Sequence, residues 1–395
     1  KEYGGSFLLN YRYSTASLIG ELGLVDINGV PKFQDAAFKV VLPTEKAGNF
    51  SVFGLSGLSS LDLEDVTPDI WSTPGDRFQQ TEIREDFDKK AFLLNTGLNH
   101  TYSLNENSFI KTTLAFSSEG IEDDIYELTT TTLFDSNGNF IRDSLGGKTL
   151  NFTSDLIKST YRAASTYHNK INAKNKLQVG SKYALFNYSF KQSQFEQREA
   201  DRRSLIDFNE NVATLRNFIS WKYRLNETFT IISGLHNMNV LYNNKSTLEP
   251  RIALHWQVND KSAIKAGYGS HSTMESIHNY FAQVELPNGE LIEPNKNLGL
   301  LKAHHYVIGY EKRFSNKFMG KIELYYQDLY NLPVENNDTS YYATINEGLE
   351  FRYVDLVNEG TGENYGIELT FERFFSNNYY YLINGSLFNS KYQSL

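Results

Sequence analysis

The sequence of 395 residues contains no cysteine and only 8 prolines. The absence of cysteine excludes a disulfide framework and thiolate zinc sites, and it is compatible with both cytosol and periplasm. Positive charge is also scarce: 38 Lys and Arg stand against 47 Asp and Glu, a formal net charge of -9, and no basic block occurs. Binding to nucleic-acid phosphates requires a basic patch, so we expect no nucleic-acid partner.

Long apolar runs are lacking as well. The longest, such as residues 91–94, are far shorter than the stretch of about 18 apolar residues that predicts a spanning helix. The sequence therefore excludes a helical membrane protein. Residues 1–5 show no charged segment followed by an apolar one, so they do not predict a secretion signal, and the chain is expected to be mature or to begin within a domain.

Aromatic residues, by contrast, are abundant at 14%, with 26 Tyr and 27 Phe. They accompany a strict alternation of apolar and polar residues, which is the period of a β-strand whose two faces meet different solvents. One phase holds the residues that we expect to face lipid: Ile252, Leu254, Trp256, Ile322, Leu324, Ile367 and Leu369. The opposite phase holds the residues that we expect to face a polar lumen: Arg251, His255, Glu323, Glu368 and Glu372.

The connections between these segments alternate between short and long. Short polar turns are predicted near residues 105–108, 226–227, 259–261, 315–316 and 376–378, and long loops over residues 57–87, 120–157, 192–209, 272–301 and 331–360. A soluble sandwich does not need this alternation, whereas a bacterial outer-membrane barrel has short periplasmic turns and longer extracellular loops. With strands of about 10 to 16 residues, we expect roughly fifteen strands in one continuous domain over residues 1–395. Aromatic pairs beside the short turns favour a girdle at headgroup level.

Four segments resemble the TonB-dependent outer-membrane receptors, particularly those of Bacteroidota. They are residues 4–14 (GGSFLLNYRYS), 295–310 (NKNLGLLKAHHYVIGY), 322–334 (IELYYQDLYNLPV), and the pair NEG at 358–360 with NYGIEL at 364–369. The resemblance extends from near residue 1 to near residue 395 and departs from the broader pattern at Leu300-Leu301-Lys302. It implies an all-β, transmembrane, antiparallel up-and-down barrel in the bacterial outer membrane.

The resemblance also has implications for what surrounds the chain. No segment resembles the plug or the TonB-contacting box, and residues 386–395 do not resemble an aromatic-ended terminal strand. Because plugged transporters have about 22 strands, we expect this chain to be a partial barrel. The expected partners are outer-membrane lipid, TonB through the plug, and a small-molecule, glycan or peptide ligand, with a surface lipoprotein as a further candidate.

No catalytic, cofactor or metal site is predicted. His304 and His305 are neighbours on a strand and so point to opposite faces, whereas His271 and His278, in or beside a loop, are expected to be solvated. The carboxylates of Glu119 and of residues 122–124 are expected to form a solvated acidic loop rather than a calcium site, since no EF-hand spacing accompanies them. No nucleophile or base motif stands near the paired carboxylates, so we expect no enzyme.

The long loop at residues 331–360 is the expected ligand-contacting segment, because it combines flat rings with a fixed charge. Its candidate residues are Tyr341, Tyr342, Phe351, Arg352 and Tyr353; packing of these rings between loops is an equally good interpretation. The leading hypothesis for function is TonB-coupled active uptake of a scarce nutrient. Two others stay open: a barrel that scaffolds surface lipoproteins or secretion components, and a passive porin-like channel.

Overall fold

A computed structural model describes residues 4–14, 29–64, 69–72, 78–195, 202–346 and 352–395. In these residues almost every regular element is a strand, and the sheet order follows the sequence: β1-β2-β3-β5-β6-β7-β8-β9-β10-β11-β12-β15-β16-β17-β18, with β4 paired to β5. No helix in this part of the chain is long and apolar enough to cross a membrane. The order is an antiparallel meander, as the sequence predicted.

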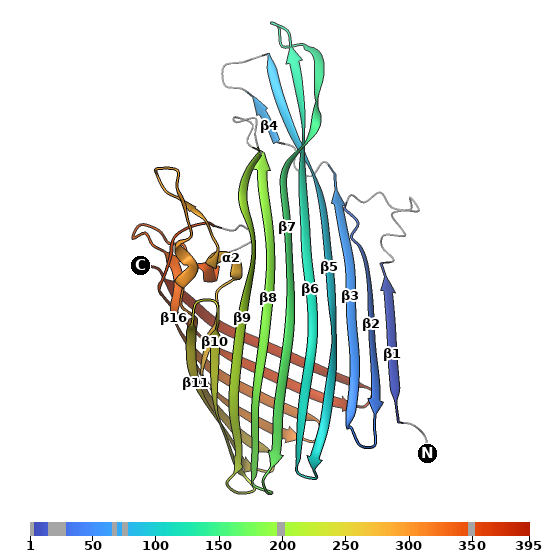
Figure 1. The fold of residues 1–395 in the computed structure, drawn as a ribbon, viewed down its shortest axis with the longest axis vertical. Helices are drawn as coiled ribbons and strands as arrows, with labels where there is room; N and C mark the ends of the chain where they lie inside the picture. Colours follow the sequence, from blue (N-terminus) through green and yellow to red (C-terminus); the bar gives the residue numbers. More distant parts are fainter. Residues whose placement is uncertain (1–3, 15–28, 65–68, 73–77, 196–201, 347–351) are drawn as a thin grey trace. The chain divides into compact units, whose positions relative to one another are not determined.

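The strands of the large sheet have the following bounds: β1 Ser6–Tyr13, β2 Lys32–Pro43, β3 Asn49–Leu63, β4 Asp69–Ser72, β5 Gln79–Asn105, β6 Ser108–Phe134, β7 Phe140–Lys170, β8 Asn175–Phe195, β9 Arg202–Arg224, β10 Phe229–Val240, β11 Lys245–Asn259, β12 Ser262–Thr273, β15 Leu301–Ser315, β16 Phe318–Glu335, β17 Leu356–Ser376 and β18 Tyr379–Gln393. Figure 1 shows β5, β6, β7 and β8 as long neighbouring strands. Two short strands, β13 Val284–Glu285 and β14 Leu291–Ile292, form a separate pair.

The short turns predicted from the sequence are confirmed. Each of the five lies between the end of one strand and the start of the next; β17, for example, ends at Ser376 and β18 begins at Tyr379. Between them, Asn377 and Asn378 have positive φ values of 56° and 66°. Asparagine tolerates this left-handed region better than most residues, so a tight reversal forms at low cost.

Three of the long-loop predictions are wrong, because strands occupy much of each segment. In the segment 120–157, β6 continues to Phe134 and β7 begins at Phe140, so only a turn separates the strands. The segments 57–87 and 192–209 also contain strand residues, because β3 reaches Leu63 and β8 reaches Phe195. The predicted strand length of about 10 to 16 residues is also wrong for these strands. β5 and β6 have 27 residues each, and β7 has 31.

The acidic segment that suggested a loop is part of β6. Its carboxylates have partners on neighbouring strands: Asp123 pairs with Lys89 at 3.0 Å, and Glu119 pairs with Lys158 at 2.9 Å. A charged run therefore does not mark a loop when adjacent strands supply opposite charges, because cross-strand pairs stabilise the ladder.

The chain forms two compact units, described here one at a time. Unit 1 comprises residues 1–100, 114–162 and 186–211, and unit 2 comprises residues 101–113, 163–185 and 212–395. In unit 2 the cross-strand register places apolar side chains in continuous rows on one face. One such row consists of Leu254, Ala266, Ile308, Leu324, Ile367 and Leu387.

The opposite face of these strands is polar. The row beside the one just described consists of His255, Lys265, Gly309, Glu323, Glu368 and Ser386. On the apolar face, Ile308 is 52% exposed and Leu324 49% exposed. Large exposed aliphatic side chains in unbroken rows are typical of a surface that contacts lipid rather than water.

Aromatic side chains bound the apolar rows of unit 2. On one side, Tyr268, Tyr306, Tyr326 and Tyr365 are aligned across four strands, with ring centroids of Tyr268 and Tyr306 5.1 Å apart. On the side of the short turns, the Phe318 and Phe371 rings stack at 5.9 Å. Amphipathic rings at both limits of an apolar band are the arrangement of membrane-interface girdles.

The two faces predict opposite effects of one substitution. We expect Leu254→Arg to impair insertion into the outer membrane, because a cation on the lipid face costs about 2–4 kcal/mol near the bilayer midplane. His255→Arg, one residue away on the polar face, is the matched control and should assemble normally. Heat-modifiable gel mobility measures assembly; equal mobility of the two variants would overturn the assignment of the faces.

Candidate functional site

Two long connections of unit 2 pack together into one structured body. The first joins β12 to β15 and contains α2 Ile277–Tyr280, β13, β14 and the 3-10 helix η1 Pro294–Asn297. The second joins β16 to β17 and contains η2 Thr344–Asn346. The described residues of these two segments, 274–300, 336–346 and 352–355, are called the loop platform below.

An apolar centre holds the first segment together. Tyr280 is 1% exposed and Ala282 is fully buried, while Phe281 packs against Tyr242 from the β10–β11 connection with ring centroids 5.1 Å apart. Burial raises the pKa of the Tyr280 phenol to about 12. The hydroxyl therefore stays protonated at neutral pH, and it accepts a hydrogen bond from the backbone N–H of Glu275 at 3.3 Å.

The buried carboxylate of Glu275 links the two segments. Its Oε2 accepts a hydrogen bond from the Thr344 hydroxyl at 2.7 Å, and its Oε1 accepts bonds from the Ser276 N–H at 2.8 Å and the Asn279 amide at 3.2 Å. A buried carboxylate is costly unless its oxygens are paired. These bonds therefore fix Thr344 of the second segment against α2 of the first.

Asparagine side chains make the remaining links by bonding to the backbone. Asn295 donates to the carbonyl of Val354 and accepts from the N–H of Leu356, both at 2.9 Å. Asn358, at the start of β17, accepts from the N–H of Gly299 at 2.6 Å and donates to the carbonyl of Asn331 at 3.0 Å. An irregular backbone needs such partners when it is buried, so these residues hold the platform in one conformation.

The platform presents a few exposed groups. Tyr341 is 83% exposed, and its carbonyl accepts a hydrogen bond from the Tyr392 hydroxyl at 2.8 Å. The Arg352 guanidinium lies over the Tyr342 ring, 5.1 Å from its centroid. Tyr353 is half-buried, and Phe351 lies outside the described residues. The structure thus brings Tyr342 and Arg352 together, and this pair combines a flat ring with a cation.

The residues expected to face a lumen share one face of unit 2. The register aligns His255, Glu323 and Glu368 in one row through Lys265 and Gly309. Arg251 and Glu372 have the same phase on β11 and β17. Arg251 also forms an ion pair with the buried Glu249 at 2.7 Å.

One prediction for the histidines is confirmed and another is wrong. His304 and His305 point to opposite faces. The His304 ring packs beside Tyr330, with ring centroids 5.1 Å apart, and the His305 ring packs beside His271, with ring centroids 4.5 Å apart. The expectation that His278 is solvated is wrong, because α2 buries it at 6% exposure. Within the described ranges, no group of three or more potential ligand side chains is arranged to hold a metal ion.

Sequence reasoning missed Glu275, Asn279 and Thr344 altogether. Asn295 and Asn358 lie in the segments that carry the family resemblance, yet nothing in those segments indicates that they bond to a second loop. The available signal is compositional: asparagine bonds readily to backbone groups in irregular segments. Identifying the partners requires the fold, because Asn295 and Leu356 are 61 residues apart in sequence.

Comparison with known families identifies the chain. Residues 39–394 match the model described as "TonB dependent receptor-like, beta-barrel". The chain belongs to the TonB-dependent receptors. This family places the receptor in the bacterial outer membrane, which agrees with the apolar face and the girdles of unit 2. Its members are receptors rather than enzymes. No curated protein matches the receptor.

Solved structures share its fold at low sequence identity. The RagAB peptide transporter has a TM-score of 0.62 at 10% identity, covering 93% of this receptor chain and 47% of that chain. The siderophore receptor PiuA from Acinetobacter baumannii has 0.58 at 12%, covering 99% and 60%. The outer membrane transporter YddB from Escherichia coli has 0.52 at 11%, covering 99% and 61%. The chain thus spans about half to three fifths of the length of these proteins.

The hydrogen bonds of Asn295 predict the effect of its removal. We expect Asn295→Ala to leave the Leu356 N–H and the Val354 carbonyl without buried partners, at a cost of about 1–3 kcal/mol each. Hydrogen exchange at Leu356 should accelerate roughly tenfold or more, because the platform opens locally. Asn288→Ala, in the exposed β13–β14 turn, is the control. Unchanged exchange in Asn295→Ala would show that the asparagine links do not hold the platform.

Proposed function

We propose that this receptor imports a scarce nutrient across the outer membrane by TonB-coupled active transport. The proposal rests on one observation. The chain belongs to a receptor family, and its long connections form a hydrogen-bonded platform that exposes aromatic and charged side chains. The whole chain, residues 1–395, would belong to one barrel domain. By family resemblance, TonB would act through a plug domain of the receptor.

The residues proposed to contact the ligand lie on the loop platform. Tyr341 offers an exposed ring, and Tyr342 with Arg352 offers a ring already in contact with a cation. Such groups suit a small molecule, a glycan or a peptide that carries both flat or apolar parts and a negative charge. The matched structures include a peptide transporter and a siderophore receptor. A surface lipoprotein that covers the platform is a further partner of this proposal.

The polar face of unit 2 would line the path below the platform. Arg251, His255, Glu323, Glu368 and Glu372 share that face, and their mixed charges suit a hydrated lumen. A scaffold for lipoproteins or secretion components would also use the platform, but it has no need for an energy source. A passive channel would conduct without TonB. Dependence on the proton gradient therefore separates the proposed function from both alternatives.

The energy requirement is tested by growth competition. The receptor-bearing strain and its deletion mutant compete on media that limit one nutrient class at a time: peptide digest, ferric chelate or polysaccharide. We expect the deletion mutant to be outcompeted on one medium, and the advantage of the receptor to vanish when tonB is deleted in both strains. An advantage that persists without TonB would instead indicate passive conduction or a scaffold.

The role of the platform is tested on the limiting medium identified in this way. Replacing both Tyr341 and Arg352 by Ala in the full-length receptor should weaken ligand binding about 10- to 100-fold, because exposed aromatic and arginine anchors carry much of such affinities. Tyr380→Ala is the control, since Tyr380 is 73% exposed beside the β17–β18 turn. Normal surface display with undiminished uptake would remove these residues from the binding site.

A further inference from the structure

The strands of unit 1 do not all end at the same level. Gly180 of β8 lies against Thr166 of β7 across the hairpin that joins them. By this register Phe195, the last residue of β8, lies opposite about residue 151 of β7. Residues 140–149, at the start of β7, therefore extend beyond the end of β8, and Figure 1 shows the β6–β7 hairpin continuing past it. This segment is called the β7 extension below.

The β7 extension has one paired edge and one uncovered edge. Among the described residues β7 pairs only with β6 and β8, and β8 does not reach this segment. Residues 140–149 are all exposed, whereas residues 125–134 of β6 are half-buried. In a strand with one neighbour, about half of the backbone N–H and C=O groups point away from the sheet. The extension therefore offers a row of hydrogen-bonding groups on the side away from the short turns, which is the extracellular side.

The uncovered edge lacks the features that usually prevent the addition of a strand. Natural edge strands are very short, contain proline or carry charges that block the edge. The strand β4, at the other side of β5, has only four residues, whereas residues 140–149 form a long edge without proline. Two of its charges contact the sheet: Lys148 pairs with Asp86 at 2.6 Å, and Asp143 accepts a hydrogen bond from Thr132 at 2.8 Å. A further strand can therefore approach without displacing them.

A glycine pair within the extension leaves room for a close approach. A Cβ on Gly146 would lie 2.9 Å from the carbonyl oxygen of Thr129, so this glycine allows tight pairing with β6. A Cβ on Gly147 would have no atom within 4 Å. Glycine within a strand often marks a place where another backbone comes close. The open space at Gly147 fits such a contact.

The side chains of the extension indicate which strand fits. Successive residues of a strand point to opposite faces, so Ile141 and Leu145 share one face and Arg142 lies on the other. Ile141 and Leu145 are 56% and 81% exposed, and Arg142 is exposed as well. Cross-strand neighbours stabilise a pair of strands when apolar side chains meet or when opposite charges meet. The matching strand therefore alternates apolar residues with residues that include an acid.

Two other occupants do not fit this edge. A glycan has no ladder of N–H and C=O groups at the spacing of a strand. A second receptor in the same membrane would be related to the first by an axis along the membrane normal, because both insert with the same orientation. Strands tilted by about 35–45° would then cross at roughly 70–90°, so the two β7 edges could not pair. A single added strand also covers an edge but no face, so it binds weakly and reversibly, which suits a peptide that is captured and released.

We propose that the β7 extension captures extended peptides at the cell exterior by adding them as a strand to its uncovered edge. Ile141, Leu145 and Arg142 select sequences that alternate apolar and acidic residues. The inference rests on the proposed function and deepens it, because it names peptides as the ligand class. Binding is measured without transport, so a receptor that binds no peptide can still import another nutrient, and a receptor that fails in uptake can still bind peptide.

The first test measures the affinity of a synthetic peptide of about ten alternating valine and glutamate residues for the purified full-length receptor, by fluorescence anisotropy. The same peptide, N-methylated at every second residue, keeps its side chains and its charge but loses donors to the ladder. Two N-methylated forms, one for each set of alternate residues, are compared. We expect one of them to bind about tenfold or more weakly than the unmodified peptide, because main-chain hydrogen bonds supply the affinity of an added strand.

A variant of the receptor tests the edge itself. Leu145→Lys should weaken peptide binding roughly tenfold, because a lysine on an edge strand opposes strand addition. Its positive charge would strengthen a purely electrostatic attraction to the acidic peptide, so the direction of the change separates the two modes of binding. Asn137→Lys is the matched control: it adds the same charge at an exposed position of the β6–β7 turn and should not weaken binding. Surface display confirms that both variants assemble.

The second test detects the strand register. Residues 1–395 contain no cysteine, so Ser144→Cys and Leu145→Cys each introduce a single thiol into this chain. Peptides with one cysteine at successive positions should form disulfides with a period of two residues. The favoured positions should shift by one residue between the two variants, because neighbouring residues face opposite sides of the sheet.

Four results would each overturn the proposal. They are equal binding of the unmodified peptide and both N-methylated forms, unchanged or tighter binding by Leu145→Lys, an equal loss in Asn137→Lys, and disulfides without a period of two residues. If Leu145→Lys is not displayed, the N-methylated peptides and the native receptor still decide the question.

Discussion

The constraint on which this structure depends is that a bilayer offers no water to backbone N–H and C=O groups. A strand can cross the apolar band only if the strands on both sides satisfy its two hydrogen-bonding edges. The meander order of the large sheet meets this requirement by pairing strands that follow one another along the sheet. Because the register is unbroken through the central part of the strands from β11 to β18, with shifts only toward their ends, side chains of one kind form rows there.

The same requirement shapes the loop platform, where no ladder is available. Glu275 accepts a hydrogen bond from the Thr344 hydroxyl of the second segment, and Asn295 and Asn358 bond to backbone groups, in place of the missing strand partners. In the loop platform, side chains therefore satisfy backbone groups that neighbouring strands satisfy in the sheet. The platform that presents the exposed Tyr341 and the Tyr342–Arg352 pair is held by the hydrogen bonds of Glu275, Asn295 and Asn358.

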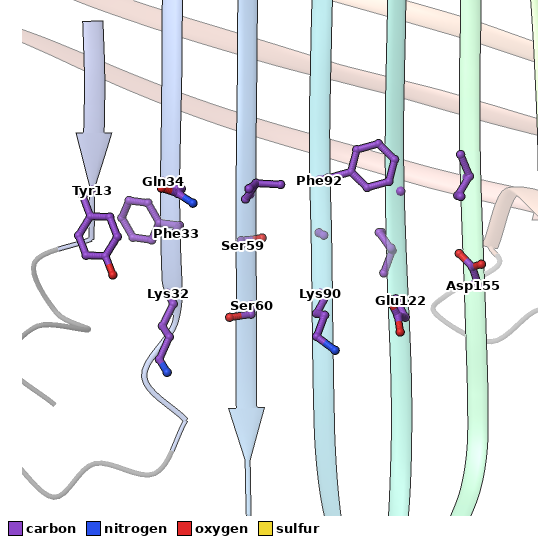
Figure 2. Close-up of a pocket in the computed structure, with 15 residues that line it drawn as sticks. Tyr13, Lys32, Phe33, Gln34, Ser59, Ser60, Lys90, Phe92, Glu122 and Asp155 are labelled. Atoms are coloured by element: carbon purple, nitrogen blue, oxygen red, sulfur yellow. The ribbon is translucent and has the colours of Figure 1, made fainter. Parts of the chain in front are cut away.

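The two faces of the sheet differ in the polarity of their side chains. The polar face of unit 2 carries acids, bases and histidines, which suits contact with water. The apolar face of unit 1, which exposes Phe7 and Leu9, ends in a row where Lys32 and Lys90 flank Ser60 (Figure 2). On a lipid-contacting face, charged side chains are tolerated near its limits, because a cation deeper in the apolar band would be costly. The two faces therefore differ in the solvent that contacts them: water on the polar face and lipid on the apolar face.

The sequence by itself determined the strand phases, the short turns and the family, because these depend on residues that are neighbours along the chain. Alternation in residues 251–258 and the asparagines at 377–378 are examples. The tertiary structure decided the rest. Lys89 and Lys158 on adjacent strands pair with acids of β6, so the acidic run lies within a strand and not in a loop. The bond from Thr344 to Glu275 joins residues 69 positions apart, and a groove of unit 1 draws its lining from six strands. Such contacts form only when the register brings distant residues together, and no local pattern encodes which residues will meet.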